Sequence, residues 1–508
     1  MISLADQVAE LPDGTKQPGV DFHVLCRYIA QHYINKQSEK DRREKSARRQ
    51  RFYMSGGDND MATFITSVIK DPVVQAKRLE FIQHSKWNNV LRRVCHELAT
   101  VYSYPAKRKV KAENDNARYQ ELQRACRQHE VMLRANRLAI LHRNVLIGPR
   151  VRNANGKLEP VLDVITPDCF FAVCHPNDPL SLIAVIIDLN VKSIAGGRVP
   201  KFIVWSAAEW FLLDAQGVPL SAAPTPHDVG EIPFLLLSLE PPTTQLLDET
   251  TGDDLEAAHR AVWFLGILLM KEAKSATKQH VISGDMSNVT RGQAADTDVP
   301  IEAGEGTAVN TIDNSMDLSM YVATIDSVFQ TAAANYGLPP SVLKHDGVQS
   351  AEARELVRVP LREIRLQQQI PFRDLERDLA RLQSKIIGKQ IPEFAFSNDG
   401  WLVDFADPQS PLGTKEGLDV FEKERQLGLT STIREIERRN SDLDRQAAAK
   451  LLLDCVEEEL IRNEAMRPLQ AISGSPGALM RDAATENTAS AASDGSFSWV
   501  KEVLRGAA

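Results

Sequence analysis

The chain has 508 residues, of which 43% are hydrophobic and 25% are charged, and its formal net charge is −8. This composition is that of a folded protein long enough for two to four domains with their own cores. The negative charge excludes a protein that wraps nucleic acid tightly, because such binding needs clustered cations. Any contact with DNA is therefore expected to be local or transient.

The cysteines and the N-terminus indicate the cellular compartment. Six cysteines are scattered through the chain without a C-x-x-C pair, which predicts reduced and mostly buried thiols. The start MISLADQVAELPDG carries acids early and lacks the apolar core of a signal peptide, so we expect synthesis in the cytoplasm. The longest apolar run, AVWFLGILLM at 261–270, is too short to span a bilayer, and no membrane span is expected.

Residues 1–145 are predicted to be mostly helical. The stretches VLCRYIAQHYINK and VVQAKRLEFIQHSKWNNVLRRVCHELATVYSY place apolar residues three and four positions apart. In the second stretch these residues fall mainly on one stripe: Leu79, Ile82, Val90, Val94 and Leu98.

A basic run, RREKSARRQR, lies between these two stretches. It could contact phosphate or an acidic protein. A solvated helix that ends in a turn at Gly56 and Gly57 is the preferred interpretation.

From residue 146 to 242 the sequence changes to short β-branched and aromatic runs separated by turn residues, which predicts a β-rich region. GPRVRNANGKL at 148–158 is predicted to be a hairpin turn, because its spacing does not fit a phosphate-binding loop. A helix is expected over 253–279, with acids in its first turn. A short Gly-, Asp- and Thr-rich region with strand-like VIS, VPI and AVNTI follows at 280–314.

A second helix is predicted for 315–336, with Ser315 as its cap and Gly337 as its stop. Its expected apolar face consists of Leu318, Tyr321, Val322, Ile325, Val328 and Phe329.

A polar loop at 337–349 leads into one very long helix from Ser350 to Ile387. Pro360 and Pro371 each remove a backbone hydrogen bond and are predicted to kink this helix. Two further helical stretches are expected, EGLDVFEKERQLG and the run from Thr432 to Met466. The last residues, 467–508, are predicted to form a flexible tail.

No catalytic, cofactor-binding or metal-binding constellation is found. His96-Glu97 and His129-Glu130 begin like zinc motifs, but the second histidine is missing in both. The acid pairs Asp58/Asp60 and Asp296/Asp298 lack the other ligands of a calcium loop and are interpreted as solvated turns. The chain is therefore not expected to be an enzyme or to need a cofactor.

The order of the parts carries more information than any single motif. A β-rich region is followed by a helix, a compact Gly- and Asp-rich tip, a returning helix, a loop and a long helix interrupted by prolines. The most specific stretch is IEAGEGTAVNTIDNSMDLSMYVATIDSVFQTAAANYGLPPSVL. In this order the sequence resembles the portal proteins of tailed bacteriophages, over residues from about 45 to 465.

The resemblance implies an α+β, predominantly helical fold of the portal type, with a β-rich segment in the wing. The implied parts, in chain order, are an N-terminal wing at 1–252, stem helices at 253–279 and 315–336 with a clip at 280–314 between them, a tunnel loop at 337–349, a kinked wing helix with return strands at 350–410, a helical crown at 411–466 and the tail at 467–508.

The resemblance also implies a function and partners. Portal proteins form a dodecameric ring at one capsid vertex, through which the terminase motor packages the genome and through which DNA later leaves. The expected partners are further copies of the chain, double-stranded DNA in the channel, the terminase large subunit, the major capsid protein and scaffold, and the head-completion adaptor protein. The protein would be assembled in the host cytoplasm and reside in the virion at the portal vertex.

Within the implied tunnel loop, Lys344 and His345 are the candidate DNA contacts, balanced by Asp346, although a plain solvated loop fits these residues as well. The implied hinge residues of the loop are Gly337, Pro339, Pro340 and Gly347. Twelve chains of charge −8 would carry about −96, and a wall of that sign favours sliding of DNA over adhesion.

Two other classes of function stay open from the sequence. The basic run RREKSARRQR suggests a nucleic-acid-processing enzyme or its helical accessory subunit. An intracellular scaffold with helical arms would form no ring and bind no DNA.

Overall fold

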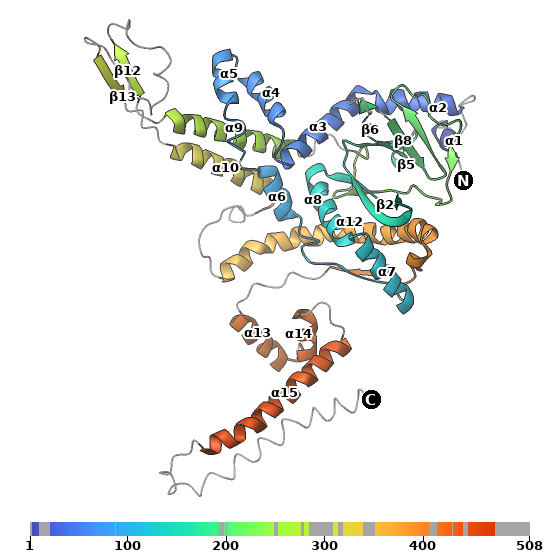
Figure 1. Ribbon diagram of the computed structural model, residues 1–508, viewed down its shortest axis with the longest axis vertical. Coiled ribbons are helices and arrows are strands. Elements are labelled where there is room, and N and C mark those ends of the chain that lie inside the picture. The colour runs from blue at the N-terminus through green and yellow to red at the C-terminus, as the bar shows by residue number, and fades with distance from the viewer. Residues whose placement is uncertain are drawn as a thin grey trace. The chain divides into compact units, whose positions relative to one another are not determined.

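The computed structural model of the protein is an α+β fold in which strands are concentrated between Asn144 and Ser238 (Figure 1). The chain divides into two compact units, Met1–Pro411 and Leu412–Ala508. The described residues are 3–9, 21–86, 88–189, 191–192, 198–199, 201–247, 252–275, 279–283, 308–312, 318–338, 351–405, 414–428, 430–439 and 445–472.

The predicted β-rich region forms two antiparallel sheets (Figure 1). One has five strands in the order β10-β9-β8-β5-β4, and the other has three in the order β11-β2-β3. The strands are β2 (Asn144–Ala154), β3 (Lys157–Ile165), β4 (Phe170–His175), β5 (Asp178–Asp188), β8 (Lys201–Ser206), β9 (Glu209–Asp214), β10 (Thr225–Pro226) and β11 (Leu235–Ser238), with a separate short pair β6 (Val191–Lys192) and β7 (Arg198–Val199).

The β2–β3 connection confirms the predicted hairpin turn. Asn155 and Gly156 have φ angles of 53° and 85°. A two-residue hairpin turn that matches the twist of its strands requires positive φ at both central residues, which Asn-Gly accepts readily.

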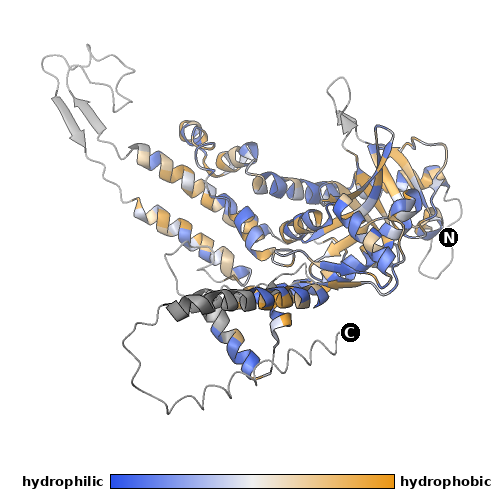
Figure 2. Ribbon diagram, turned by 60° about the horizontal axis from the view of Figure 1, so that its bottom comes forward, coloured by the Kyte–Doolittle hydropathy of each residue, from blue (hydrophilic) through white to orange (hydrophobic). Residues whose placement is uncertain are grey.

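The five-stranded sheet is apolar on both faces, and much of the orange colouring in Figure 2 lies on its strands. Phe171 and Ile186 pack with Leu25 of the N-terminal helices, whereas their neighbours Phe170 and Val185 pack toward the three-stranded sheet. Successive residues of a strand point to opposite faces. This explains why runs such as LIAVIIDL are apolar throughout. The covering helices are α1 (Leu4–Val8), α2 (Phe22–Ile29) and the π-helical turn η1 (Ala30–Ile34).

The helical part of the first unit differs from the sequence-based expectation at one place. The stretch from 73 to 104 was expected to carry a single apolar stripe, but it contains two helices separated by turns. The second helix starts because the side chain of Asn89 accepts the backbone N–H of Arg92. Leu79 is consequently 37% exposed, while Ile82, Val90, Val94 and Leu98 are buried. The helices and the short strand of this part are α3 (Gln37–Tyr53), α4 (Asp58–Val68), α5 (Pro72–Leu79), α6 (Val90–Leu98), β1 (Lys107–Lys109), α7 (Glu113–Ala125) and α8 (Gln128–His142).

The long helix α12 (Ala351–Gln390) packs against β2 and β11 and contains both Pro360 and Pro371. The helix continues through both prolines, and the kinks stay a prediction. The chain then passes through η3 (Pro392–Phe394) to β14 (Leu402–Asp404), which pairs with β1.

A buried charge fixes α12 on the rest of the first unit. Glu376 is fully buried and accepts hydrogen bonds from Arg108 Nε at 2.9 Å, Tyr102 Oη at 2.8 Å and Gln128 Nε2 at 2.9 Å. Burial and the charge of Glu376 raise the pKa of Tyr102 well above its usual value, so the phenol stays protonated and donates. A carboxylate in the interior is tolerated only with such partners.

Replacing Glu376 by Gln is expected to lower the free energy of unfolding by about 3–5 kcal/mol, because Arg108 would remain buried without a counter-charge. Denaturant or thermal unfolding of the full-length protein measures the loss. Asp374→Asn is the control on the same helix, since its side chain is 62% exposed and pairs only at the surface; a change of less than about 1 kcal/mol is expected. Equal losses in the two variants would contradict the importance of the buried charge.

In the segment 280–314 the structure describes one hairpin. β12 (Gln279–Ser283) pairs antiparallel with β13 (Ala308–Ile312), which confirms the strand-like VIS and AVNTI, while VPI lies outside the described residues.

The second unit contains α13 (Thr414–Gln426), α14 (Thr432–Arg439) and α15 (Arg445–Ile472). The run predicted as helical from Thr432 to Met466 is thus two helices. Ser431 caps α14, because its Oγ accepts the N–H of Arg434 at 3.3 Å, and α14 begins at Thr432 as the predicted helical run does. The flexible tail was predicted for 467–508, but residues 467–472 belong to α15, so that part of the prediction is wrong. The rest of the predicted tail, 473–508, lies outside the described residues.

Candidate functional site: the α9–α10 helix pair and its anchor on α3

Two antiparallel helices occur in the predicted segments, α9 (Asp253–Ser275) and α10 (Ser319–Asn335), but both are shorter than predicted. Gln279 already belongs to β12, and Leu318 precedes α10, so the predicted cap at Ser315 is wrong. The end of α10 is bonded to the start of α9: Tyr336 Oη and Asn335 Nδ2 donate to the carboxylate of Asp254 at 2.9 and 3.3 Å. Burial and then the charge of Asp254 raise the pKa of Tyr336, so its hydroxyl stays a donor. The two helices therefore lie side by side with opposite directions (Figures 1 and 2).

The predicted helix stop at Gly337 is confirmed. Gly337 has a φ of +67°, its N–H bonds to Ala334 O at 3.0 Å, and the N–H of Leu338 bonds to Ala333 O at 2.9 Å. These are the two hydrogen bonds of a Schellman motif, which requires a left-handed residue at this position. Leu338 is buried and fixes the direction in which the chain leaves the helix.

The surface of α10 is almost free of charge. Between Ser319 and Asn335 the sequence SMYVATIDSVFQTAAAN contains one acid, Asp326, and no cation. Ile325 and Phe329 of the expected apolar face are buried, but Val322 is 48% exposed, so that part of the prediction is wrong. The buried face of α10 continues instead with Ala332 and Ala333, whose small side chains allow a neighbouring helix to approach closely.

Helix α9 is packed on several sides, as its nearly continuous apolar sequence predicts. Trp263 is 3% exposed, and its indole N–H is shared between Ile82 O at 3.2 Å and Ser85 Oγ at 3.0 Å. Leu255, Val262 and Ile267 are also buried. The helix is thus an integral part of the main core rather than a free arm.

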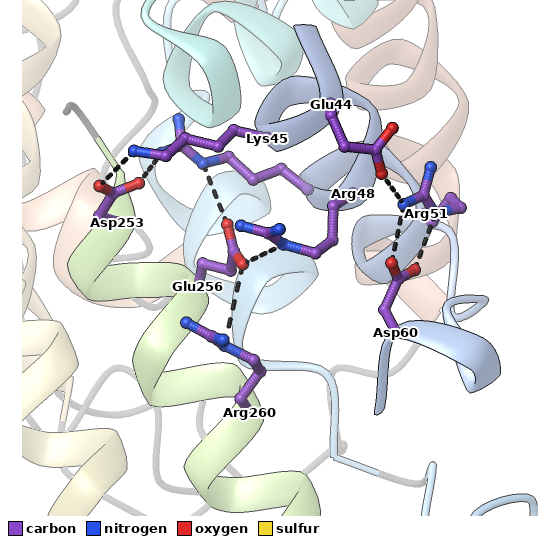
Figure 3. Close-up of polar contacts among 9 residues, drawn as sticks. Glu44, Lys45, Arg48, Arg51, Asp60, Asp253, Glu256 and Arg260 are labelled. Carbon is purple, nitrogen blue, oxygen red and sulfur yellow. Dashed lines mark hydrogen bonds and ion pairs between the residues drawn. The ribbon is translucent and has the colours of Figure 1, made fainter. Parts of the chain in front are cut away.

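The first turn of α9 is held by cations of α3 (Figure 3). Glu256 is 1% exposed and lies 2.6 Å from Arg48 Nε and 3.5 Å from Arg49 Nε. Asp253 pairs with Lys45 Nζ at 3.3 Å and with Arg49. The sequence marks these acids only as favourable to the helix dipole; their main role is to join two helices.

The N-terminal half of α3 is bonded to the five-stranded sheet. Arg42 donates to Pro167 O at 3.1 Å and Phe170 O at 3.0 Å, and Arg43 donates to Asp188 Oδ2 at 2.7 Å. One helix therefore connects the β-rich region to the α9–α10 pair.

This pairing corrects both interpretations of the basic run. All six cations of RREKSARRQR, residues 42–51, are bonded within the chain, the last one being Arg51 with Asp60 at 2.8 Å. The run is neither a solvated helix nor a surface ready to bind phosphate. The turn predicted after it is confirmed, with Gly57 at a φ of +85°. Asp58 and Asp60 begin α4 and pair with Lys86 and Arg51, so they are not the solvated turn that the sequence suggests.

Replacing Glu256 by Gln is expected to cost about 3 kcal/mol of unfolding free energy, because two arginines would lose a buried counter-charge. The matched control is Glu44→Gln on α3, whose side chain is 62% exposed and pairs with Arg51; less than about 1 kcal/mol is expected there. Thermal unfolding measures both, and a Glu256→Gln protein as stable as the control would refute the anchor.

His259 makes the same region sensitive to acid. Its ring is 4% exposed and packs between Phe52 and Trp263, and burial lowers its pKa to about 4. The unfolded state takes up a proton below the ordinary pKa of 6.5, whereas the folded state does so only near pH 4.

The contribution of neutral His259 to the free energy of unfolding is therefore fully present above pH 6.5. It should be lost, by up to about 3 kcal/mol, as the pH falls toward 4. His259→Leu is expected to flatten this part of the pH profile of unfolding. An unchanged slope between pH 6.5 and 4 in that variant would show that other groups control it.

The predicted tunnel-loop residues Pro339, Pro340, Lys344, His345 and Gly347 lie outside the described residues, so their roles stay predictions. Within the described ranges, no group of three or more His, Cys, Asp and Glu side chains is placed to hold a metal ion. None of the described helices is both long and apolar enough to cross a membrane. The six cysteines are free, and Cys26, Cys95 and Cys126 are buried.

Comparison with known proteins finds distant likenesses among solved structures. No model of a protein family matches the sequence. No curated protein matches it either. Three solved chains of a gene transfer agent (GTA) particle match at 12% identity. One is from the virion of the native particle, with a TM-score of 0.33 over 68% of this chain and 88% of that chain. Another is from the neck of the empty particle computed with C6 symmetry, with a TM-score of 0.34 over 69% of this chain and 90% of that chain. The third is from the neck of the native particle computed with C12 symmetry, with a TM-score of 0.33 over 71% of this chain and 92% of that chain. At these TM-scores the likeness assigns neither a fold nor a function to this chain.

Proposed function

We propose that the chain is a portal subunit of a phage-type particle. Twelve copies would form a ring at one capsid vertex, serve as the conduit for DNA packaged by the terminase motor and later released, and act without chemistry of their own. The terminase large subunit and then the head-completion adaptor would meet the segment 280–314. The major capsid protein and scaffold would meet the sheet-bearing region 1–252.

The observation that carries the proposal is the antiparallel α9–α10 pair. Its helices are joined at one end by a segment with a β-hairpin and are bonded at the other end through Asp254. Helix α3 connects this second end to the β-rich region. A wall built from such pairs needs rigid rods whose ends are fixed. The end formed by the start of α9 and the end of α10 is fixed here by bonds within one chain, which leaves the sides of the helices for contacts with neighbouring copies.

The charge of α10 supports a role beside moving DNA. Helix α10 has no Lys or Arg between Ser319 and Asn335, so it offers phosphates no cation. The acid Asp326 is exposed on it. A channel wall of this kind lets DNA slide instead of holding it.

The alternative of a nucleic-acid-processing enzyme has lost its motivating observation, since the cations of residues 42–51 are bonded internally. No second function is proposed.

Electron microscopy of the purified full-length protein in negative stain tests the proposal. Rings with a central hole are expected, together with a mass that is a multiple of the chain mass in solution. A stable monomer at high concentration, or a closed particle without an axial opening, would refute it.

A further inference from the structure

Three neighbouring arginines outside α3 have no counter-charge in the part of the chain that the structure describes. Arg92 of α6 and Arg134 and Arg137 of α8 make no ion pair with any carboxylate of the described residues. The arginines of α3 all have acidic or carbonyl partners. Those of α6 and α8 have none among the described residues, although the three helices pack on one another.

A Tyr–His pair joins α3 to α6, and Arg92 lies one helical turn before its histidine. Tyr53, at the end of α3, lies with its Oη 3.0 Å from Nε2 of His96 on α6. Arg92 precedes His96 by four residues, and Arg134 precedes Arg137 by three, so each pair shares one face of its helix. Burial lowers the pKa of His96, and the charges of Arg137 and Arg92 lower it further.

Tyr53 responds to the same charges. Burial raises its pKa, while Arg137, Arg92 and Arg134 act in the opposite direction. The three arginines therefore belong to the charged surroundings of the Tyr–His pair.

No ion pair among the described residues neutralises these three charges. Like charges repel one another across neighbouring helices. The Nε–H of Arg137 is buried without an acceptor in the described structure, which costs free energy until an acceptor is supplied. Arg92 and Arg134 are exposed and available to a ligand from solution.

The surroundings indicate what kind of anion fits. Among the described residues, neither α6 nor α8 exposes a large hydrophobic side chain, so the surface lacks the apolar centre that a protein interface normally contains. Guanidinium and phenol groups are common ligands of backbone phosphates. Three arginines on two neighbouring helices match a polyanion better than a single carboxylate.

We propose that Arg92, Arg134 and Arg137, together with Tyr53 and His96, form a binding site for the phosphates of a nucleic-acid backbone. The proposal deepens the function proposed above and rests on it, since it adds a DNA contact outside the segment 337–349. It can fail while ring formation holds, because its readout is binding and not assembly.

The test uses the full-length protein and a short mixed-sequence DNA duplex with a fluorescent label. Binding is measured by anisotropy between about 50 and 200 mM salt. The double variant Arg92→Gln/Arg134→Gln changes two exposed residues and should fold normally. We expect weaker binding, with the slope of log K against log salt reduced by about 0.9 for each phosphate that is no longer bound. Arg137→Gln, tested separately, is expected to act in the same direction.

Lys40→Gln/Arg124→Gln is the matched control, because it removes the same charge from two exposed sites on α3 and α7. Binding and salt slope should equal those of the wild type. Inorganic phosphate at matched ionic strength should leave DNA binding unchanged.

Several results would overturn the proposal. One is that the wild-type protein does not bind DNA, and another is that the control and the Arg92/Arg134 variant lose the same amount of binding. A third is that inorganic phosphate displaces DNA from the wild type alone, which would make a free anion the ligand. Loss of ring assembly with unchanged DNA binding would show that the cluster is a contact between copies of the chain and not a nucleic-acid site.

Discussion

The structure of the first unit depends on the ion pairs between α3 and the first turn of α9. A carboxylate as buried as that of Glu256 is stable only with cations beside it, and Arg48 and Arg49 supply them. The same helix bonds to the five-stranded sheet through Arg42 and Arg43. One charged helix thus fixes the position of the helix pair relative to the sheets.

The arginines of this chain show that residue type alone does not determine a role. Those of α3 bond to carboxylates and carbonyl oxygens and hold parts of the chain together. Those of α6 and α8 make no ion pair with a carboxylate of the described residues, and our proposal assigns them to an external anion. The sequence makes the first set look like the binding surface, since six cations fall within ten residues, whereas the second set is dispersed.

The proposed function and the proposed phosphate site divide two tasks between different helices. Helix α10, with its single charge, suits a surface past which DNA moves. The arginine cluster suits a point at which a phosphate is held for a time. The net charge of −8 is compatible with both, because it disfavours general adhesion and leaves room for a local contact.

The sequence by itself determined the features that arise from neighbouring residues. Local sequence patterns located α9, α10 and α12, Asn155-Gly156 fixed a hairpin, and Gly337 ended a helix, because helix, turn and cap signals act over only a few residues. Only the tertiary structure decided which charges are neutralised. Arg48 meets Glu256 across 208 residues of sequence, and Arg108 meets Glu376 across 268. Such pairs depend on how whole elements pack, which no local pattern encodes, and so the sequence could not distinguish a paired arginine from a free one.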